Sequence, residues 1–355
     1  MKRKQFILTL VVLAALVALV VWGRDSIHFN FGVFRSQLAL ADWRRIAVGV
    51  ACIYLGYVFR SVRWALLIKH NKKVPPLSLL STQVIGFTAV ALIGRVADLV
   101  RPYLVAKKAD LPLSTQIAVY IVERLCDFGS MGLMFSAAIL FAAQGSLPHP
   151  EIVRKAGGSA LVLTLGGGLF LIVVRLTGNA VAVAMERAFG VVSKKLGHAV
   201  GQRIGAFRTG LDTMRTFSDF CVTAALSLGM WCLIFLAYLE TSRAFIASPP
   251  LASMTLAKCM LLLAFSGVAS VFQLPVLGWF TQIGAVAAAL SGFFGASTEA
   301  ATACAATLLL VTFLSIVPVG LIWAQFEHVN LRKVAVESEH AGEELAVAEA
   351  AESTE

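Results

Sequence analysis

Six apolar stretches, each long enough to cross a lipid bilayer, recur along this chain of 355 residues. A transmembrane helix needs roughly 17 to 25 predominantly apolar residues. The predicted spans are residues 6–22, 46–68, 115–142, 159–175, 219–246 and 298–323. Only 14% of the residues are charged, against about 25% in an average soluble domain. We therefore predict an all-α polytopic membrane protein, which excludes a soluble enzyme.

The first span follows Lys2-Arg3-Lys4, an arrangement that signal peptides and first transmembrane helices share. Its apolar run is longer than a usual signal-peptide core, and no small-residue cleavage site follows it. Gly23-Arg24-Asp25 is instead typical of a membrane interface. We expect this segment to remain uncleaved as a transmembrane helix.

Two further apolar stretches are interrupted where a span would need continuity. Residues 79–94 contain Gly86 and end in charged residues, and residues 256–295 are split by Pro275 and Gly278. Each is predicted to form two short helices in a re-entrant hairpin. Non-helical backbone at membrane depth is tolerated only where protein buries it or where it lines a wet cavity. The two hairpins therefore indicate such a cavity.

Lysine and arginine counts orient the chain, because cytoplasmic loops carry an excess of both. With the N-terminus inside, the predicted inner segments hold 15 basic residues and the outer segments hold 8. Both termini are therefore expected in the cytoplasm, with the spans in the cell inner (cytoplasmic) membrane. The first hairpin then enters from the cytoplasm and the second from outside, as in an inverted-topology internal repeat.

Two polar segments are expected on the cytoplasmic side. Residues 179–215 have apolar residues at steps of three and four and predict a basic amphipathic helix. This helix could lie on the anionic leaflet or extend the neighbouring spans against the bundle. Residues 326–355 are acidic and poor in aromatics, and are predicted to be a disordered tail. The domain organisation is therefore a transmembrane domain over 1–325 followed by this tail.

Three charged residues fall inside the predicted span 115–142, in the run Val122-Glu123-Arg124-Leu125-Cys126-Asp127. Ionisable groups at membrane depth cost a few kcal/mol each. On a helix Glu123 and Asp127 share a face and repel each other, whereas Arg124 can pair with Asp127. One arginine cannot neutralise two buried carboxylates. A carboxylate must bind a proton or a cation, or a second arginine must come from elsewhere.

The first hairpin offers further charges at helical steps of three, and we expect them to join these residues in one salt-bridged cluster that lines the cavity. Its predicted members are Arg95, Asp98, Arg101, Glu123, Arg124 and Asp127. The cluster could be a purely structural network, or it could leave arginines free to bind an anion such as a lipid phosphate. Arg60 and Arg63 could extend the same positive path, or could be interface residues that reach toward the headgroups.

Motifs for enzyme chemistry are missing from the sequence. No two of the six histidines have a metal-ligand spacing, and the six cysteines form no CxxC pair. Nucleotide-binding and nucleophile-elbow motifs are also absent. We therefore expect no metal, no cofactor and no enzymatic activity, with membrane lipids rather than nucleic acid as partners. An enzyme that uses Glu123 or Asp127 as acid or base is a disfavoured alternative.

These motifs resemble the flippase-like transmembrane region of lysylphosphatidylglycerol synthases and its stand-alone relatives, from the first span to Trp323. The second span ends in Arg60-x-x-Arg63-Trp64, and Glu123-Arg124-x-x-Asp127 matches a helix motif of the family. The hairpin motif Gly-Arg-x-Gly-Glu-x-x-Arg is met by residues 94–101, with Ala97 for glycine and Asp98 for glutamate.

The second hairpin is less similar to the family pattern Pro-x-x-Gly-Gly-x-Gly-x-x-Glu. Pro275 and Gly278 match it, whereas other residues replace two of its glycines and its acid, namely Trp279, Thr281 and Gly284. Gln273 and Gln282 could supply polar contacts to a substrate, or could cap exposed backbone.

The resemblance implies movement of an anionic or polyprenyl-phosphate-linked lipid between leaflets, with its headgroup bound by arginines in a midplane cavity. We expect no synthase activity, because only about thirty residues follow the last predicted span. The alternative is a lipid-binding membrane partner that transports nothing and supports a separate lipid- or glycan-modifying enzyme.

Overall fold

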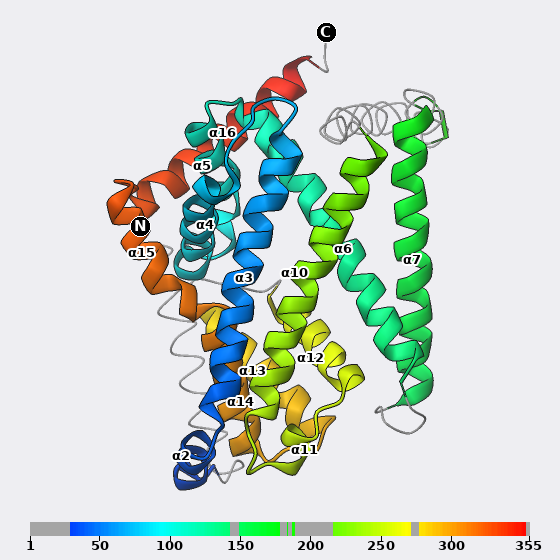
Figure 1. Ribbon diagram of the computed structural model, residues 1–355, viewed down its shortest axis with the longest axis vertical. Helices are drawn as coiled ribbons and strands as arrows, with labels where there is room; N and C mark the ends of the chain where they lie inside the picture. The colour runs from blue at the N-terminus through cyan, green and yellow to red at the C-terminus, as the bar shows by residue number, and fades with distance from the viewer. Residues whose placement is uncertain are drawn as a thin grey trace.

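The computed structural model describes residues 29–142, 149–177, 216–270 and 277–352, together with 183, 187 and 188. Every regular element within these residues is a helix (Figure 1), so the predicted all-helical class is confirmed for them. The predicted first span, most of the basic segment 179–215, and Gln273 and Pro275 lie outside the described residues.

Four long helices run between two ends of the molecule, called upper and lower as drawn in Figure 1. They are α3 (Trp43–Ile68), α6 (Leu113–Leu140), α7 (Pro150–Thr177) and α10 (Phe217–Arg243). Helix α10 packs along α3, and α7 packs along α6. Two short helices, α2 (Phe31–Ala39) and α11 (Pro249–Ala252), lie at the lower end.

Three described segments are long and apolar enough to cross a membrane, namely Trp43–Ile68, Pro76–Ile93 and Phe217–Arg243. A fourth is the pair α14 (Thr298–Thr312) and Leu314–Phe326, if its 41° bend is accepted within one span. These segments include the predicted spans 46–68 and 298–323, and they contain the predicted span 219–246 up to Arg243. In α6, every 18-residue window contains Glu123, Arg124 and Asp127. The described residues therefore hold three or four apolar spans, and the total of six stays a prediction.

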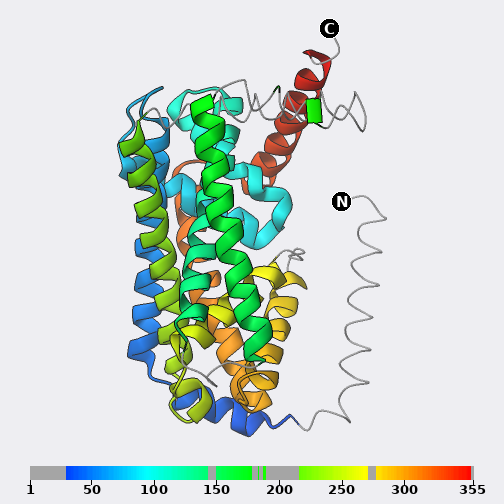
Figure 2. The same ribbon diagram turned by 90° about the vertical axis from the view of Figure 1, so that its right-hand side faces the viewer.

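Two helical hairpins occupy opposite halves of the bundle (Figures 1 and 2). The upper one consists of α4 (Leu80–Ile93) and α5 (Val100–Ala109), joined by the short helix η2 (Arg95–Leu99) and preceded by η1 (Pro76–Leu79). The lower one consists of α12 (Leu256–Ala269) and α13 (Leu277–Gly292). Their tips meet, because the indole N–H of Trp279 donates to the carbonyl oxygen of Ala91 at 3.1 Å.

The prediction that Gly86 breaks the first hairpin is wrong. Helix α4 continues through Gly86, and the chain turns at Gly94, whose φ of 91° is a conformation that favours glycine. A Cβ at Gly86 would instead overlap Cγ of Arg101 and lie 3.2 Å from its Cα. Gly86 thus allows α5 to approach α4 closely.

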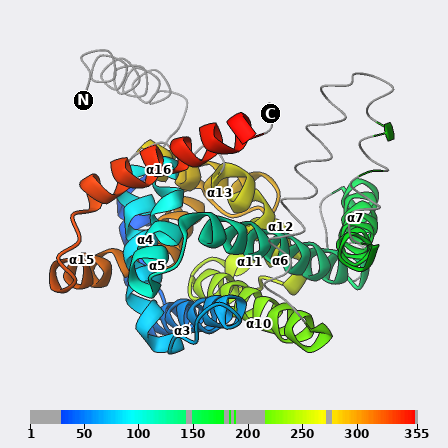
Figure 3. The same cartoon turned by 90° about the horizontal axis from the view of Figure 1, so that it is seen from above.

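The tail predicted to be disordered is helical over most of its length. After α15 (Val317–Phe326), helix α16 (Leu331–Glu352) runs beside the first hairpin (Figure 3). Val334 and Ala335 are buried against apolar residues of that hairpin. The hydroxyl of Tyr103 also donates to Glu337 Oε2 at 3.0 Å. These contacts in the first turns of α16 outweigh the acidic composition on which the prediction of disorder rested.

The contact between the hairpin tips yields a stability prediction. Trp279→Phe removes the only donor that Ala91 oxygen has among the described residues, near the end of α4, and we expect a loss of about 1 kcal/mol. Thermal unfolding of the purified protein in detergent measures it. The matched control is Trp231→Phe, because the indole N–H of Trp231 is buried with no hydrogen-bond partner in the described part of the chain. An equal loss of stability in both variants would show that the hydrogen bond from Trp279 to Ala91 does not stabilise the fold.

Candidate functional site

Two carboxylates lie one turn apart on the same face of α6. Glu123 is 1% exposed and Asp127 is 4% exposed. The sequence places them at i and i+4, so the helix itself brings their negative charges together. Buried carboxylates need partners from other helices, since an isolated buried charge is far too costly.

Arg63 of α3 bridges both carboxylates. Its Nη2 donates to Glu123 Oε1 and its Nη1 to Asp127 Oδ1, each at 2.6 Å. The same Nη1 also donates to the hydroxyl of Ser227 on α10 at 2.7 Å. The planar guanidinium therefore satisfies two acids at once and joins α3, α6 and α10.

Arg101 reaches the other oxygen of Glu123 from the first hairpin. Its Nη1 donates to Glu123 Oε2 at 3.0 Å and to Gln83 Oε1 at 3.3 Å. The side chain is fully buried. Its guanidinium carbon lies 4.4 Å from the ring centre of Phe87 and 5.1 Å from that of Tyr120. Aromatic faces thus stabilise the charge where water is excluded.

Arg60, one turn before Arg63 on α3, is held more loosely. Its Nη1 lies 3.8 Å from Glu123 Oε1 and 3.7 Å from Asp127 Oδ2. This buried Nη1 makes no hydrogen bond within the described residues. The guanidinium lies over Phe87, 4.7 Å from the ring centre. Three arginines thus face two carboxylates, and Arg60 supplies the excess positive charge.

A cavity of about 190 Å³ opens beside Arg60, between α3, α10 and the two hairpins. Its lining is mostly apolar and aromatic, and Arg60 is the only charged residue among the described residues that line it. The second hairpin contributes polar groups, where Gln282 Nε2 donates to Ser266 Oγ at 3.1 Å. Ser266 is also hydrogen-bonded to the hydroxyl of Tyr238 at 2.7 Å. The cavity therefore holds the cationic side chain of Arg60 in a mostly apolar lining with a few polar groups from the second hairpin and α10.

The structure brings together Arg60, Arg63, Arg101, Glu123 and Asp127 from the predicted set. The pairing that helical spacing allows between Arg124 and Asp127 is not the one found, because Asp127 faces Arg63 and Arg60 while Arg124 lies over the Tyr120 ring at 4.9 Å.

The remaining predicted residues lie at the two hairpins. Arg95 and Asp98 are on η2, at the turn of the first hairpin, and the position of the Arg95 side chain is outside the described part. Gly278 is buried in the first turn of α13. Gln282 lines the cavity and bonds a side chain rather than capping backbone.

Sequence reasoning did not identify the polar residues that complete the network. Gln83 and Ser227 accept hydrogen bonds from the arginines, and Gln116 Oε1 accepts from the indole N–H of Trp64 at 2.8 Å. Each is a polar side chain inside an apolar helix, and this pattern in the sequence could have identified them as members of a buried polar network.

Comparison with known proteins gives one match. A family model described as "Lysylphosphatidylglycerol synthase TM region" matches residues 6–320. No curated protein and no solved structure matches the chain.

Loss of Arg63 should unfold this part of the bundle. Arg63→Ala leaves two buried carboxylates without their bridging partner, at a cost of about 3 to 5 kcal/mol. We expect aggregation on size exclusion or a large fall in the unfolding midpoint. Arg45→Ala is the control on the same helix, because its ion pair with Glu240 is much more exposed, with the two side chains 41% and 19% exposed, and should contribute about 1 kcal/mol. Similar behaviour of the two variants would refute the bridging role.

Gly86→Ala should displace Arg101. The added methyl overlaps the Arg101 side chain, and overpacking of this kind costs about 1 to 3 kcal/mol. Gly284→Ala in α13 is the control, since its Cβ would meet nothing within 4 Å. Thermal unfolding midpoints measure the effect, and we expect a lower midpoint in Gly86→Ala but not in Gly284→Ala. An unchanged midpoint in Gly86→Ala would show that the hairpin accommodates the methyl group without strain.

Proposed function

Since this chain belongs to the lysylphosphatidylglycerol synthase transmembrane region family, it is a membrane protein with a lipid-related function, and we propose that it moves lipids between leaflets. The proposed cargo is an anionic or polyprenyl-phosphate-linked lipid. Its headgroup would enter the cavity beside Arg60 while its hydrocarbon chains stay in the bilayer.

Arg60 carries this proposal. Arg63 and Arg101 are committed to carboxylates at hydrogen-bonding distance, whereas both carboxylates lie beyond such a distance from Arg60 Nη1. A phosphate in the cavity would complete the charge balance of three arginines and two acids. Guanidinium groups suit this task, because their planar donors match phosphate oxygens in pairs. The structural role thus belongs to Arg63 and Arg101, and the binding role to Arg60.

The two hairpins support a transport path. They extend from opposite ends and meet at Trp279 and Ala91 (Figure 2). We propose that both are re-entrant and that their tips lie near the bilayer midplane, as in transporters built from inverted repeats. A headgroup bound between the tips could then be exposed to one side at a time. No chemical step is assigned to Glu123 or Asp127, so we propose a translocator and not an enzyme.

We propose that the upper end faces the cytoplasm, in the inner membrane. That end holds the loop with Lys69, Lys72 and Lys73, and it also holds α16. Lysine-rich short loops favour the cytoplasmic side. With this orientation the first hairpin enters from the cytoplasm and the second from outside.

Leaflet exchange in proteoliposomes tests the proposal. Vesicles of the full chain carry fluorescent phosphatidylglycerol or a fluorescent polyprenyl phosphate, and a membrane-impermeant quencher reports the outer leaflet over time. We expect wild-type exchange above that of empty vesicles, and a fall of about tenfold or more in Arg60→Ala, because a charge-assisted contact is lost. Arg60→Lys should keep part of the rate, and Arg45→Ala all of it.

Two results would overturn the proposal. Exchange by the wild type at the rate of empty vesicles would show that no lipid is moved. Retained exchange in Arg60→Ala would remove the headgroup role of Arg60. Binding of labelled lipid that depends on Arg60, without any exchange, would favour the lipid-binding partner of a separate enzyme.

A further inference from the structure

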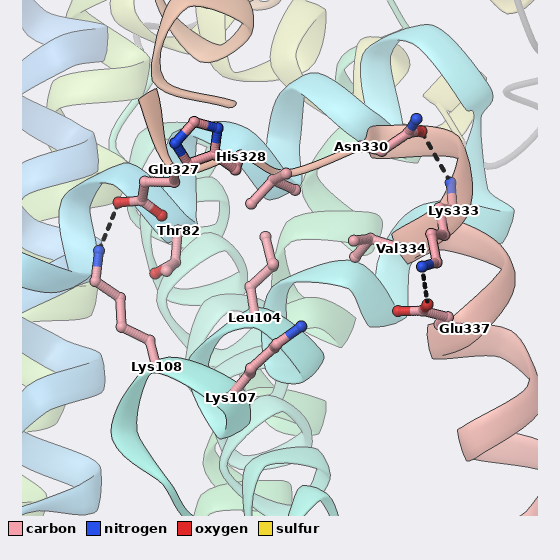
Figure 4. A pocket seen from close by; sticks show the side chains of 11 residues that line it. Thr82, Leu104, Lys107, Lys108, Glu327, His328, Asn330, Lys333, Val334 and Glu337 are labelled. Carbon is pink, nitrogen blue, oxygen red and sulfur yellow. Dashed lines mark hydrogen bonds and ion pairs between the residues drawn. The ribbon is translucent and has the colours of Figure 1, made fainter. Parts of the chain in front are cut away.

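A second pocket lies at the upper end, apart from the cavity beside Arg60. It has a volume of about 340 Å³ and lies between the first hairpin and the segment that joins α15 to α16 (Figure 4). No residue lines both spaces. Its volume falls in the range of small-molecule sites, about 300 to 1,000 Å³.

Lysines dominate the charge of this pocket. Lys108 is committed, since its Nζ donates to Glu327 Oε1 at 2.6 Å and to Ser81 Oγ at 2.9 Å. Lys107, drawn below Leu104 in Figure 4, has no hydrogen bond or ion pair with any described residue. Two glutamates and three lysines line the space, so Lys107 is the cation without a carboxylate.

Lys333 is held only weakly. Its Nζ is 3.7 Å from Glu337 Oε1, and the lysine side chain is 75% exposed. Exposed pairs of this kind contribute little to stability. The other carboxylate oxygen of Glu337 accepts the hydroxyl hydrogen of Tyr103, which fixes the acid in place. Lys333 is therefore available to an anion that enters the pocket between the first hairpin and the start of α16.

The neighbouring helix points to a lipid as the source of that anion. α15 ends directly before the pocket, and its exposed side is apolar, with Leu321 40%, Ile322 51% and Phe326 78% exposed. A hydrocarbon chain along this side would place its headgroup level with residues 327–333. Leu104 and Val334 supply apolar lining to the same pocket. Lysine is a suitable phosphate ligand as a point charge.

From these observations we propose that the pocket binds the phosphate of an anionic phospholipid headgroup through Lys107 and Lys333. The site is distinct from the transport cavity and does not depend on transport. Basic pockets beside membrane helices suit this chemistry, because each lysine near the surface adds favourable energy toward an anionic lipid.

Photocrosslinking of lipid to the full chain tests the site by position. A phosphatidylglycerol that carries a photoactivatable group next to its headgroup is incorporated into phosphatidylcholine vesicles with the protein, and labelled peptides are mapped by mass spectrometry. We expect labelling within residues 321–337 that unlabelled phosphatidylglycerol displaces. Phosphatidylcholine and soluble glycerol 3-phosphate should fail to displace it at the same concentrations.

Lysine variants test whether binding depends on the pocket itself or on the general positive charge at this end of the molecule. Lys107→Gln and Lys333→Gln should each weaken displacement by phosphatidylglycerol about fivefold, and the double variant more. Lys73→Gln is the matched control, because Lys73 is exposed at the same end and does not line the pocket. All three residues are exposed, so the variants should fold, which size exclusion verifies.

Several outcomes would overturn the inference. Displacement by phosphatidylcholine would mean that the phosphate charge is not recognised, and displacement by glycerol 3-phosphate would indicate a site for free phosphate. An equal effect of Lys73→Gln would indicate only general charge attraction. Loss of the 321–337 labelling in Arg60→Ala, but not in the double lysine variant, would assign the binding to the transport cavity. Leaflet exchange is measured separately, so this inference and the proposed function fail independently.

Discussion

The burial of Glu123 and Asp127 within one helix is the constraint on which the upper half of this bundle depends. Removing a charge from water costs several kcal/mol even after the surroundings relax, and two like charges one turn apart add repulsion. No partner on α6 resolves this, since Arg124 turns toward Tyr120. The helices that supply arginines must therefore pack against α6 in a fixed register. α3 supplies Arg63 and Arg60, and α5 supplies Arg101.

The geometry of the first hairpin follows from the need to deliver Arg101. The hairpin must turn inside the bundle, and Gly94 provides the positive φ at that turn. It must also be narrow, because the Arg101 side chain lies directly against Gly86 of α4. The carbonyl of buried Ala91, near the end of α4, is then satisfied from the opposite hairpin by Trp279. The buried ion pair of Arg101 with Glu123 and the hydrogen bond from Trp279 to the Ala91 carbonyl thus determine where the two hairpins meet.

Much of this arrangement could be predicted from the sequence, because charge at membrane depth and interrupted apolar runs are strong local signals. The membership of Arg101, Glu123 and Asp127 in one cluster came from that reasoning. The pairing of Arg124 with Asp127 could not be decided, because helical spacing shows which side chains can meet, but not whether a residue of another helix meets them first. Gly86 was misread for a similar reason, since a glycine that breaks a helix and one that admits a neighbour look alike in sequence. The tail was misread because average composition hides a short apolar patch such as Val334 and Ala335.

The same hairpin connects the interior cluster to the upper end of the molecule. Arg101 and Lys107 lie on one short helix, about 9 Å apart along its axis by the rise per residue of an α-helix. Arg101 is fully buried against Glu123, whereas Lys107 is exposed where α16 packs. Ion pairs and hydrogen bonds outside the core then hold the hairpin from above, from Lys108 to Glu327 and from Tyr103 to Glu337. Helix α5 therefore has a fully buried charge at one end and partly exposed polar contacts at the other. Salt screens exposed charges more strongly than buried ones, so the interior cluster should keep its geometry at salt concentrations that weaken the ion pair between Lys108 and Glu327.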